Sequence, residues 1–506
     1  MIYRLNRIAL CMTVGLVCLF GDVRLRAEGN RPLNVMLMTA DDLHCESLAS
    51  FGGKIPDLMP NLDRFARENM RFYRAHVNAA ICQPSRGVLG TGRYGHNSGI
   101  IGFMHTSRDI PTIMETLRDH GYLTGILGKV GHSTPHADYK WDFMHDQKEL
   151  GNGRDPALYY RYCREFLQRC RDAGKPFYFM VNSHDPHRPY HIPGKPIPGA
   201  VEPSKIYRPE DVPVPGFVPD LPGVRQELSY YLNSTRRCDD TFGKVLQALD
   251  ESGFADNTLV MFLSDNGIAI PFAKCNAYFA STHTPWIVRW PGVTKPGTVD
   301  RTHFISGVDF FPTVLDALGI PQPDGLDGRT FAPLLRGQTQ TGREDVFTQI
   351  DKKAGGAAVP MRCVQNAKFG YIYNAWSNGQ YWYRNNNEGL TMKAMNEAAP
   401  TDPFSAKRVH MFRYRTPEEL YDLENDPDCL KNLIDNPAYR DQADTMRALM
   451  REYMQRTHDP LLPALEHRDS RAQVDAVLKA FYGPQPKNAG KPRKPRKKRN
   501  NKNKRH

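Results

Sequence analysis

Four short apolar runs, each followed by polar residues, restrict the fold of this chain more than any other feature. The runs and the polar residues after them are 33–38 with Asp41 and Asp42, 123–127 with Lys129, 177–181 with His184, and 259–263 with Asp265 and Asn266. Continuous apolar runs of this length suit strands buried on both faces. Between them, residues 224–252 place apolar side chains at helical spacing before Gly253, a stop signal. The sequence therefore predicts an α/β fold.

Length and charge narrow the class of protein. A chain of 506 residues with 40% hydrophobic residues exceeds the size at which single cores divide, about 250–300 residues, so at least two domains are expected. Its 39 prolines and 40 glycines follow no period, which excludes fibrous and low-complexity classes. The net charge is +12, but residues 484–506 hold eleven Lys or Arg and no acid. The rest of the chain is nearly neutral, so no specific nucleic-acid partner is expected.

The first residues have the pattern of a secretory signal peptide, expected over 1–27. Arg4 and Arg7 precede an apolar run at 8–20, and a plausible cleavage site follows at 25–27. An uncleaved N-terminal anchor is the alternative. No later stretch is apolar enough to span a bilayer, so the mature chain should have no transmembrane helix. The signal, with a single glycosylation sequon at Asn233, favours a secreted or periplasmic, bacterial protein.

The basic tail at 484–506 contains almost nothing apolar and is expected to be disordered. It could bind a polyanion or an anionic cell surface through counterion release, or it could be a solvated tail without a specific partner. The cysteines form no C-x-x-C pair, so a zinc ribbon is unsupported, and no disulfide is predicted.

The polar residues after the four runs suggest a binding site. Ligands of open parallel sheets bind beyond the carboxyl ends of the strands, where these residues would meet. Carboxylate and amide oxygens suit Ca²⁺ or Mg²⁺ rather than zinc. Lys129, His132 and His184 would surround an anionic ligand, so the pattern predicts a site for an oxyanion ester. Any one of these groups alone could instead be a helix cap or a turn.

Residues 82–93 read C-Q-P-S-R-G-V-L-G-T-G-R. This segment resembles the signature of the sulfatase family, C-x-P-S-R followed by T-G-R, in full. The alternative is a buried structural cysteine before a helix that begins near Pro84. The resemblance covers roughly residues 32–435. It implies an alkaline-phosphatase-like domain over 28–360, with a mostly parallel sheet flanked by helices, and a smaller C-terminal α+β domain over 361–483 with a short antiparallel sheet.

The resemblance also implies the chemistry. Cys82 would be converted to formylglycine by a formylglycine-generating enzyme, and the aldehyde would hydrate to a geminal diol that attacks sulfur with one hydroxyl. Deprotonation of the other hydroxyl would then expel sulfate and return the aldehyde. The helix N-terminus at residue 82 would favour the anion.

Individual roles follow from the family motif. Residues that match the family's calcium ligands are Asp41, Asp42, Asp265 and Asn266, with the hydrated residue 82. Arg86 and Lys129 match its sulfate-binding cations. His132 matches the histidine that helps to deprotonate the diol, although His136 competes for this role. His184 matches the proton donor to the leaving group, and Lys274 a further active-site cation.

Within the family, the motifs look most like the heparan N-sulfatase (sulfamidase) branch. They are Asp41-Asp42 before Glu46-Ser47, the run 183–189, and Lys274 nine residues after Asp265. The expected substrate is a sulfated carbohydrate, with N-sulfoglucosamine of heparan-type glycans as one candidate, and His187 and Arg188 would contact a uronate or a second sulfate. Sulfamidases usually have an arginine where Lys274 stands, and the spacing of His132 from Lys129 is closer to iduronate sulfatases.

Two other functions fit the same sequence. A phosphonate or phosphate monoester hydrolase could use the same scaffold. A non-catalytic binder of sulfated glycans would leave Cys82 unmodified.

Overall fold

The computed structural model describes residues 31–385, 388–486 and 489–492. Its main feature is an eight-stranded sheet in the order β5-β4-β6-β1-β7-β8-β2-β9. The strands are β1 (Asn34–Asp41), β2 (Met70–Phe72), β4 (Leu123–Leu127), β5 (Phe143–His145), β6 (Phe177–Pro186), β7 (Thr258–Ser264), β8 (Trp286–Arg289) and β9 (Val299–Asp300).

The four apolar runs form β1, β4, β6 and β7, and these strands are neighbours in the sheet. They run parallel to one another, and β8 then pairs antiparallel with β7. Strands β1 and β7 are buried along their whole length. The predicted α/β fold with a mostly parallel sheet is therefore confirmed, because both faces of these strands are covered.

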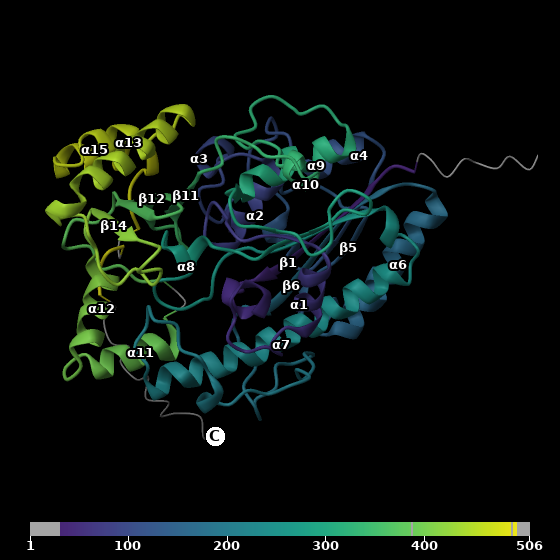
Figure 1. Cartoon of the computed structure of the whole chain (residues 1–506), viewed down its shortest axis with the longest axis horizontal. Helices are drawn as coiled ribbons and strands as arrows, with labels where there is room; N and C mark the ends of the chain where they lie inside the picture. The colour runs from purple at the N-terminus through teal and green to yellow at the C-terminus, as the bar shows by residue number, and fades with distance from the viewer. Residues whose placement is uncertain (1–30, 386–387, 487–488, 493–506) are drawn as a thin grey trace, which may run out of the picture. The chain divides into compact units, whose positions relative to one another are not determined.

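Helices cover both faces of this sheet (Figure 1). One face carries α1 (Pro60–Glu68), α6 (Pro156–Ala173) and α7 (Pro222–Asp250), the last of which is the helix expected over 224–252. The other carries α2 (Cys82–Thr91), α4 (Ile113–Asp119), α9 (Phe310–Leu318) and α10 (Ala332–Leu335). Each face has its own hydrophobic core. Shorter elements are α3 (Gly95–Ser98), α5 (Val130–Ser133), α8 (Phe279–Thr282), and β3 (Ala75–His76) paired with β10 (Ile305–Ser306).

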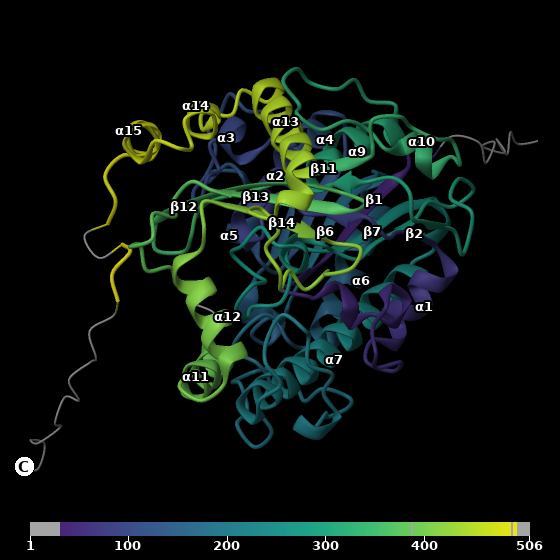
Figure 2. The ribbon, with the colours of Figure 1, turned by 60° about the vertical axis from the view of Figure 1, so that its left-hand side comes forward.

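A separate antiparallel sheet of four strands follows, in the order β11-β12-β13-β14. Its strands are β11 (Asp345–Lys352), β12 (Ala358–Asn366), β13 (Phe369–Asn374) and β14 (Glu418–Asp422), and the helices of this part are α11 (Gly389–Ala398), α12 (Pro403–Tyr414), α13 (Arg440–Arg456), α14 (Leu462–Glu466) and α15 (Arg471–Tyr482). Helix α13 lies across the sheet (Figure 2), and Met446, Met450 and Met454 share a core with Val364 and Tyr371. The expected short antiparallel sheet is thus present.

The proposed signal peptide at 1–27 lies outside the described residues, as does most of the tail at 484–506. Within the described ranges, none of the helices is long and apolar enough to cross a membrane. The eight cysteines from Cys45 to Cys429 are all buried and carry free thiols.

Candidate active site

Four oxygen-bearing side chains gather at the carboxyl ends of β1 and β7. The two strands pair in parallel with Ala40 opposite Ser264, so the residues that follow them emerge side by side. Asp42 has a left-handed φ of 68°, and its amide donates a 3.0 Å hydrogen bond to Oδ1 of Asp265. Nδ2 of Asn266 donates to Oδ1 of Asp42 at 2.8 Å. Asp41 ends β1 beside them, and all four side chains are buried.

Two lysines neutralise part of this acidic cluster. Lys129, just after β4, forms an ion pair with Asp41, and Lys274 forms one with Asp42. Burial lowers the pKa of Lys129 to about 7, against the opposing effect of Asp265. Burial alone would lower the pKa of Lys274. The attraction of the Asp42 carboxylate is stronger than this effect, so the pKa of Lys274 is raised. Lys274 therefore stays charged at neutral pH.

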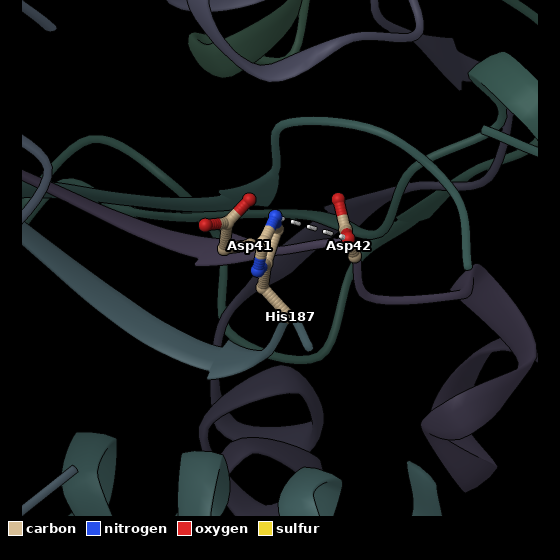
Figure 3. Close-up of side chains that lie close together, drawn as sticks. All are labelled: Asp41, Asp42 and His187. Carbon is tan, nitrogen blue, oxygen red and sulfur yellow. Dashed lines mark ion pairs between the residues drawn. The ribbon is translucent and has the colours of Figure 1, made fainter. Parts of the chain in front are cut away.

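Several buried oxygens of the cluster have no hydrogen-bond donor. Apart from the Lys129 contact, both carboxylate oxygens of Asp41 accept no hydrogen bond, and Oδ2 of Asp42 and Oδ1 of Asn266 also accept none. His187 joins them: its Nε2 lies 3.9 Å from Oδ2 of Asp42 (Figure 3). Asp41, Asp42 and His187 each offer a ligand atom within 4.8 Å of the others. Because buried oxygens need a partner, this donor set fits a hard divalent cation.

Cys82 begins α2 and is only 2% exposed. Burial raises the pKa of its thiol to about 11, with Lys274 and Arg86 opposing the rise and Asp265 and Asp42 adding to it. The carbonyl oxygen of Ala80, two residues before Cys82, accepts a 2.8 Å hydrogen bond from the amide of Cys275, which follows Lys274, so α2 begins beside the carboxylate cluster. The unmodified thiol stays protonated at neutral pH and is a weak nucleophile, because the thiolate is the reactive form.

Arg86, one helical turn after Cys82, is fully buried and connects β1, β6 and the residue that follows β7. Its Nε donates to Oδ2 of Asp265 at 3.0 Å. One terminal nitrogen donates to Oγ1 of Thr39 on β1 at 2.6 Å and to Oδ1 of Asn182 on β6 at 2.8 Å. Arg86 therefore fixes Asp265 relative to the start of α2.

An open cavity of about 270 Å³ lies beside this cluster. Five of the site residues expected from the sequence line it: Lys129, His132, His184, His187 and Arg188. His132 is half-buried in α5 and packs edge-on against Phe103, with 5.4 Å between ring centroids. Burial lowers the pKa of His132 to about 4, with Lys129 contributing, so its imidazole is neutral at pH 7.

The competing histidine, His136, lies elsewhere. Its Nδ1 is 3.0 Å from Oε1 of Glu115, and its Nε2 is 2.8 Å from the carbonyl oxygen of Ser107. Of the two, His132 is the residue that reaches the cavity.

His184 and His187 occupy different surroundings. The main-chain amide of Lys129 donates to Nε2 of His184 at 3.1 Å, whereas Nε2 of His187 faces Asp42. Burial lowers the pKa of both imidazoles well below the ordinary value. Arg188 forms an ion pair with Glu227 at 2.6 Å.

Some residues around the site were not predicted from the sequence. Thr39 and Asn182 hold Arg86, and Arg154, Asp146 and Gln147 line the cavity. A polar Asn182 directly after the apolar run of β6 was the available signal. The others carry no signal in a single sequence, because charged residues near turns are ordinary surface features.

Comparison with known proteins agrees with this geometry. The model of the sulfatase family matches residues 33–320, and a model described as the C-terminal part of N-sulphoglucosamine sulphohydrolase matches residues 270–382. Human N-sulphoglucosamine sulphohydrolase is 30% identical over 492 residues, covering 90% of this chain and 94% of the human protein.

Solved structures share the fold at lower identity. One, determined in complex with its substrate D-glucosamine-2-N,6-O-disulfate, has a TM-score of 0.64 at 19% identity and covers 85% of this chain and 99% of its own. A phosphonate monoester hydrolase from Silicibacter pomeroyi also has a TM-score of 0.64 at 19% identity. The match covers 84% of this chain and 96% of the hydrolase. The matched family model, the human relative and the C-Q-P-S-R segment at 82–86 together show that this chain belongs to the sulfatase family and is a sulfuric ester or sulfamate hydrolase.

Proposed function

We propose that this enzyme removes sulfate from a heparan-type saccharide, with the N-sulfate of glucosamine as its target. The match to the sulphohydrolase C-terminal model, which includes Lys274, and the similarity to the human enzyme support this substrate class. The fold neighbour bound to a glucosamine disulfate is consistent with it.

The observation that carries the proposal is the position of Cys82. Its thiol is buried at the start of α2 and interacts electrostatically with Lys274, Asp265 and Asp42. Cys82 is accordingly the residue that would become formylglycine, and Asp41, Asp42, Asp265 and Asn266 would hold Ca²⁺ through their buried oxygens. When present, the hydrated aldehyde supplies the nucleophile and the cation neutralises charge on the sulfate oxygens.

The remaining residues bind the anion and move protons. Lys129, Lys274 and Arg86 each form an ion pair with one carboxylate of the cluster, so the three acids are neutralised. A divalent cation bound among them would therefore leave the site positive toward a sulfate. His132, neutral at pH 7 and facing the cavity, is suited to accept a proton. His184, or His187 beside Asp42, would protonate the leaving nitrogen or oxygen. Arg188 borders the cavity where a second anionic group of the saccharide would lie.

Maturation and location belong to the same proposal. A formylglycine-generating enzyme would modify Cys82, and the segment 1–27 would direct the chain to the periplasm or the exterior of a bacterial cell. The tail at 484–506 would bind a polyanion or the cell surface. Residues 28–360 would form the catalytic domain and 361–483 the smaller domain.

The test uses enzyme produced together with a formylglycine-generating enzyme. Glucosamine N-sulfate, glucosamine 6-O-sulfate and 4-nitrophenyl phosphate are compared by release of sulfate or phosphate. We expect release from the N-sulfate and at most weak turnover of the phosphate ester. The C82A variant is the control and should be inactive, and peptide mass analysis should find formylglycine at residue 82.

The outcomes separate the alternatives. Turnover of O-sulfated sugars alone would show that the N-sulfate is not the target, while the assignment as a sulfatase would stand. Preference for the phosphate ester would favour the phosphohydrolase. An intact thiol at residue 82 in enzyme from the natural host, with no hydrolysis, would favour a non-catalytic glycan binder.

A further inference from the structure

The segment 187–189 carries His187 to the carboxylate cluster but belongs to no helix or strand. It follows directly after β6, which ends at Pro186. The side chains of the segment are engaged, His187 with Asp42 and Arg188 with Glu227. Its main chain needs support of its own, because a short irregular segment has no ladder of backbone hydrogen bonds.

Arg154 supplies that support. One terminal nitrogen of its guanidinium donates to the carbonyl oxygen of His187 at 2.9 Å and to that of Pro189 at 3.5 Å. The other donates to the carbonyl oxygen of Asn152 at 2.8 Å, and Nε donates to Oδ1 of Asp185 at 3.1 Å. The residue is 2% exposed. A single planar group thus connects Asp185, before the segment, to both ends of the segment.

Asp185 has a second arginine partner, which provides a comparison. Nε of Arg237, on α7, donates to Oδ2 of Asp185 at 2.7 Å, and another of its nitrogens donates to the carbonyl oxygen of Val201 at 2.8 Å. Both arginines are buried and both bind the same carboxylate. Arg237 also donates to Oδ1 of Asp185 at 3.2 Å but, among the described residues, makes no hydrogen bond to the main chain of 187–189.

The charge balance argues against stability as the role of Arg154. Within the described residues the one ion pair of Arg154 is to Asp185, and it shares this carboxylate with Arg237. The charge of Arg237 is also favoured by Glu202 and Asp240, so Arg154 is the less compensated of the two. Removing such a charge from water costs more than an imperfectly compensated contact returns. The geometry that Arg154 imposes is therefore a better account of its contacts than a gain in folding free energy.

We infer that Arg154 is a positioning residue, which fixes the main chain at 187–189 and through it the place of the His187 imidazole relative to Asp42. The inference rests on the proposed function, in which His187 acts at the carboxylate cluster. Lysine could not replace the arginine, because its single ammonium group cannot span Asp185 and two carbonyl oxygens in fixed directions.

The first experiment compares R154K with the matched control R237K. Steady-state kinetics use glucosamine N-sulfate and 4-nitrophenyl sulfate, and unfolding is followed by heat. We expect kcat of R154K to fall at least about 10-fold with KM changed less than about 3-fold, since small displacements of a reacting group cost rate. R237K should keep kcat within about 3-fold of wild type. Its melting temperature should fall about as much as that of R154K, because both variants weaken a contact with Asp185. Equal kinetic losses in both variants would overturn the inference.

A double-mutant cycle tests whether the effect passes through His187. If Arg154 acts by placing His187, R154K should add less than about a 2-fold loss of kcat in an H187Q background. The same loss in both backgrounds would show that Arg154 acts independently of His187, and the inference would be wrong.

Amide hydrogen exchange gives a readout that does not depend on activity. In R154K, peptides that cover 183–191 should exchange faster than in wild type, while R237K should leave them within experimental error. R154Q replaces R154K if the lysine variant does not fold. Unchanged exchange would overturn the inference even if the enzyme is an active sulfatase. If the wild type is inactive but the 183–191 peptides exchange faster in R154K, the proposed function is wrong. The conclusion that Arg154 fixes the main chain at 187–189 would then still hold.

Discussion

The main-chain amide of Lys129 donates a hydrogen bond to Nε2 of His184, with 3.1 Å between the nitrogens. A nitrogen that accepts this bond carries no proton, so His184 is held as the Nδ1–H tautomer. The same bond fixes Lys129 in its left-handed conformation, φ 52°, with its ammonium against Asp41. His184 therefore positions Lys129. His187 is also held as the Nδ1–H tautomer, because its Nδ1 donates to the carbonyl oxygen of Arg188. Its Nε2 faces Oδ2 of Asp42 and can act as an acid only after it takes up a proton.

This relationship predicts different effects of two substitutions. Glutamine can place an amide oxygen near the position of Nε2, so H184Q should keep kcat/KM within about 10-fold of wild type. H187Q should lose about 100-fold or more in kcat/KM on glucosamine N-sulfate, as expected for a missing general acid. Burial disfavours the charged imidazole of His187, so this role requires the bound anionic substrate to favour its protonated form. The loss should shrink on 4-nitrophenyl sulfate, whose leaving group needs no proton. If H184Q instead shows the larger, leaving-group-dependent loss, His184 is the acid.

The environment of His132 predicts the acid side of the pH profile. Its pKa is lowered to about 4, first by burial and then by Lys129, so the neutral imidazole persists well below pH 6. Protonation as the pH falls through this value removes the base, and kcat/KM should decline there. H132Q should lower the pH-independent value of kcat/KM about 100-fold, and its kcat/KM should no longer decline on the acid side of the profile. A limb centred near 6.5 that is lost in H132Q would contradict the low pKa.

Calcium should stabilise the folded enzyme through the unpaired oxygens of the carboxylate cluster. At a free Ca²⁺ concentration of 100 times Kd, the expected gain is about 2.7 kcal/mol. Chelation with EGTA should abolish activity and lower the melting temperature, and added Ca²⁺ should restore both. D41N, which removes one charged ligand but keeps the shape, should show a smaller gain. If added Ca²⁺ does not change the melting temperature of the wild type, the carboxylate cluster is not a cation site.

Two glycines offer a matched pair for testing the packing around His184. Gly153 and Gly174 both have positive φ, 73° and 62°, so alanine at either position should cost about 1 kcal/mol. A Cβ at Gly153 would approach Cδ2 of His184 to 2.3 Å, whereas a Cβ at Gly174 would meet nothing within 4 Å. We expect G153A to lose activity and G174A to keep it. Equal activity of the two variants would show that the imidazole of His184 can be displaced without loss of activity.

The strands and the carboxylate cluster could be predicted because they follow from local rules. Apolar runs determine buried strands, and parallel strands bring the residues after them together, so Asp42 and Asp265 meet although 223 positions separate them. The choice between His132 and His136 could not be made from spacing. It depends on the direction of the short helix α5 and on Glu115, which holds His136 outside the cavity.

The long-range contacts of the arginines were equally inaccessible. Arg154 and Arg237 meet Asp185 because α6 and α7 pack on the same face of the sheet, and nothing in the sequence near these residues indicates it. The antiparallel sheet was expected from residue 361, but its first strand, β11, begins at Asp345. Strand β11 carries the polar residues Thr348, Gln349 and Asp351 at buried positions, so neither a continuous apolar run nor an apolar–polar alternation marks it in the sequence.

The burial of Cys82 also sets an order of events during biosynthesis. With 2% of its surface accessible at the start of a buried helix, its side chain cannot enter the active site of another protein once the chain has folded. An enzyme that oxidised Cys82 would therefore have to act before the chain folds. A chain that folded before this reaction would keep its thiol, so the yield of modified protein would depend on the rate of oxidation relative to the rate of folding.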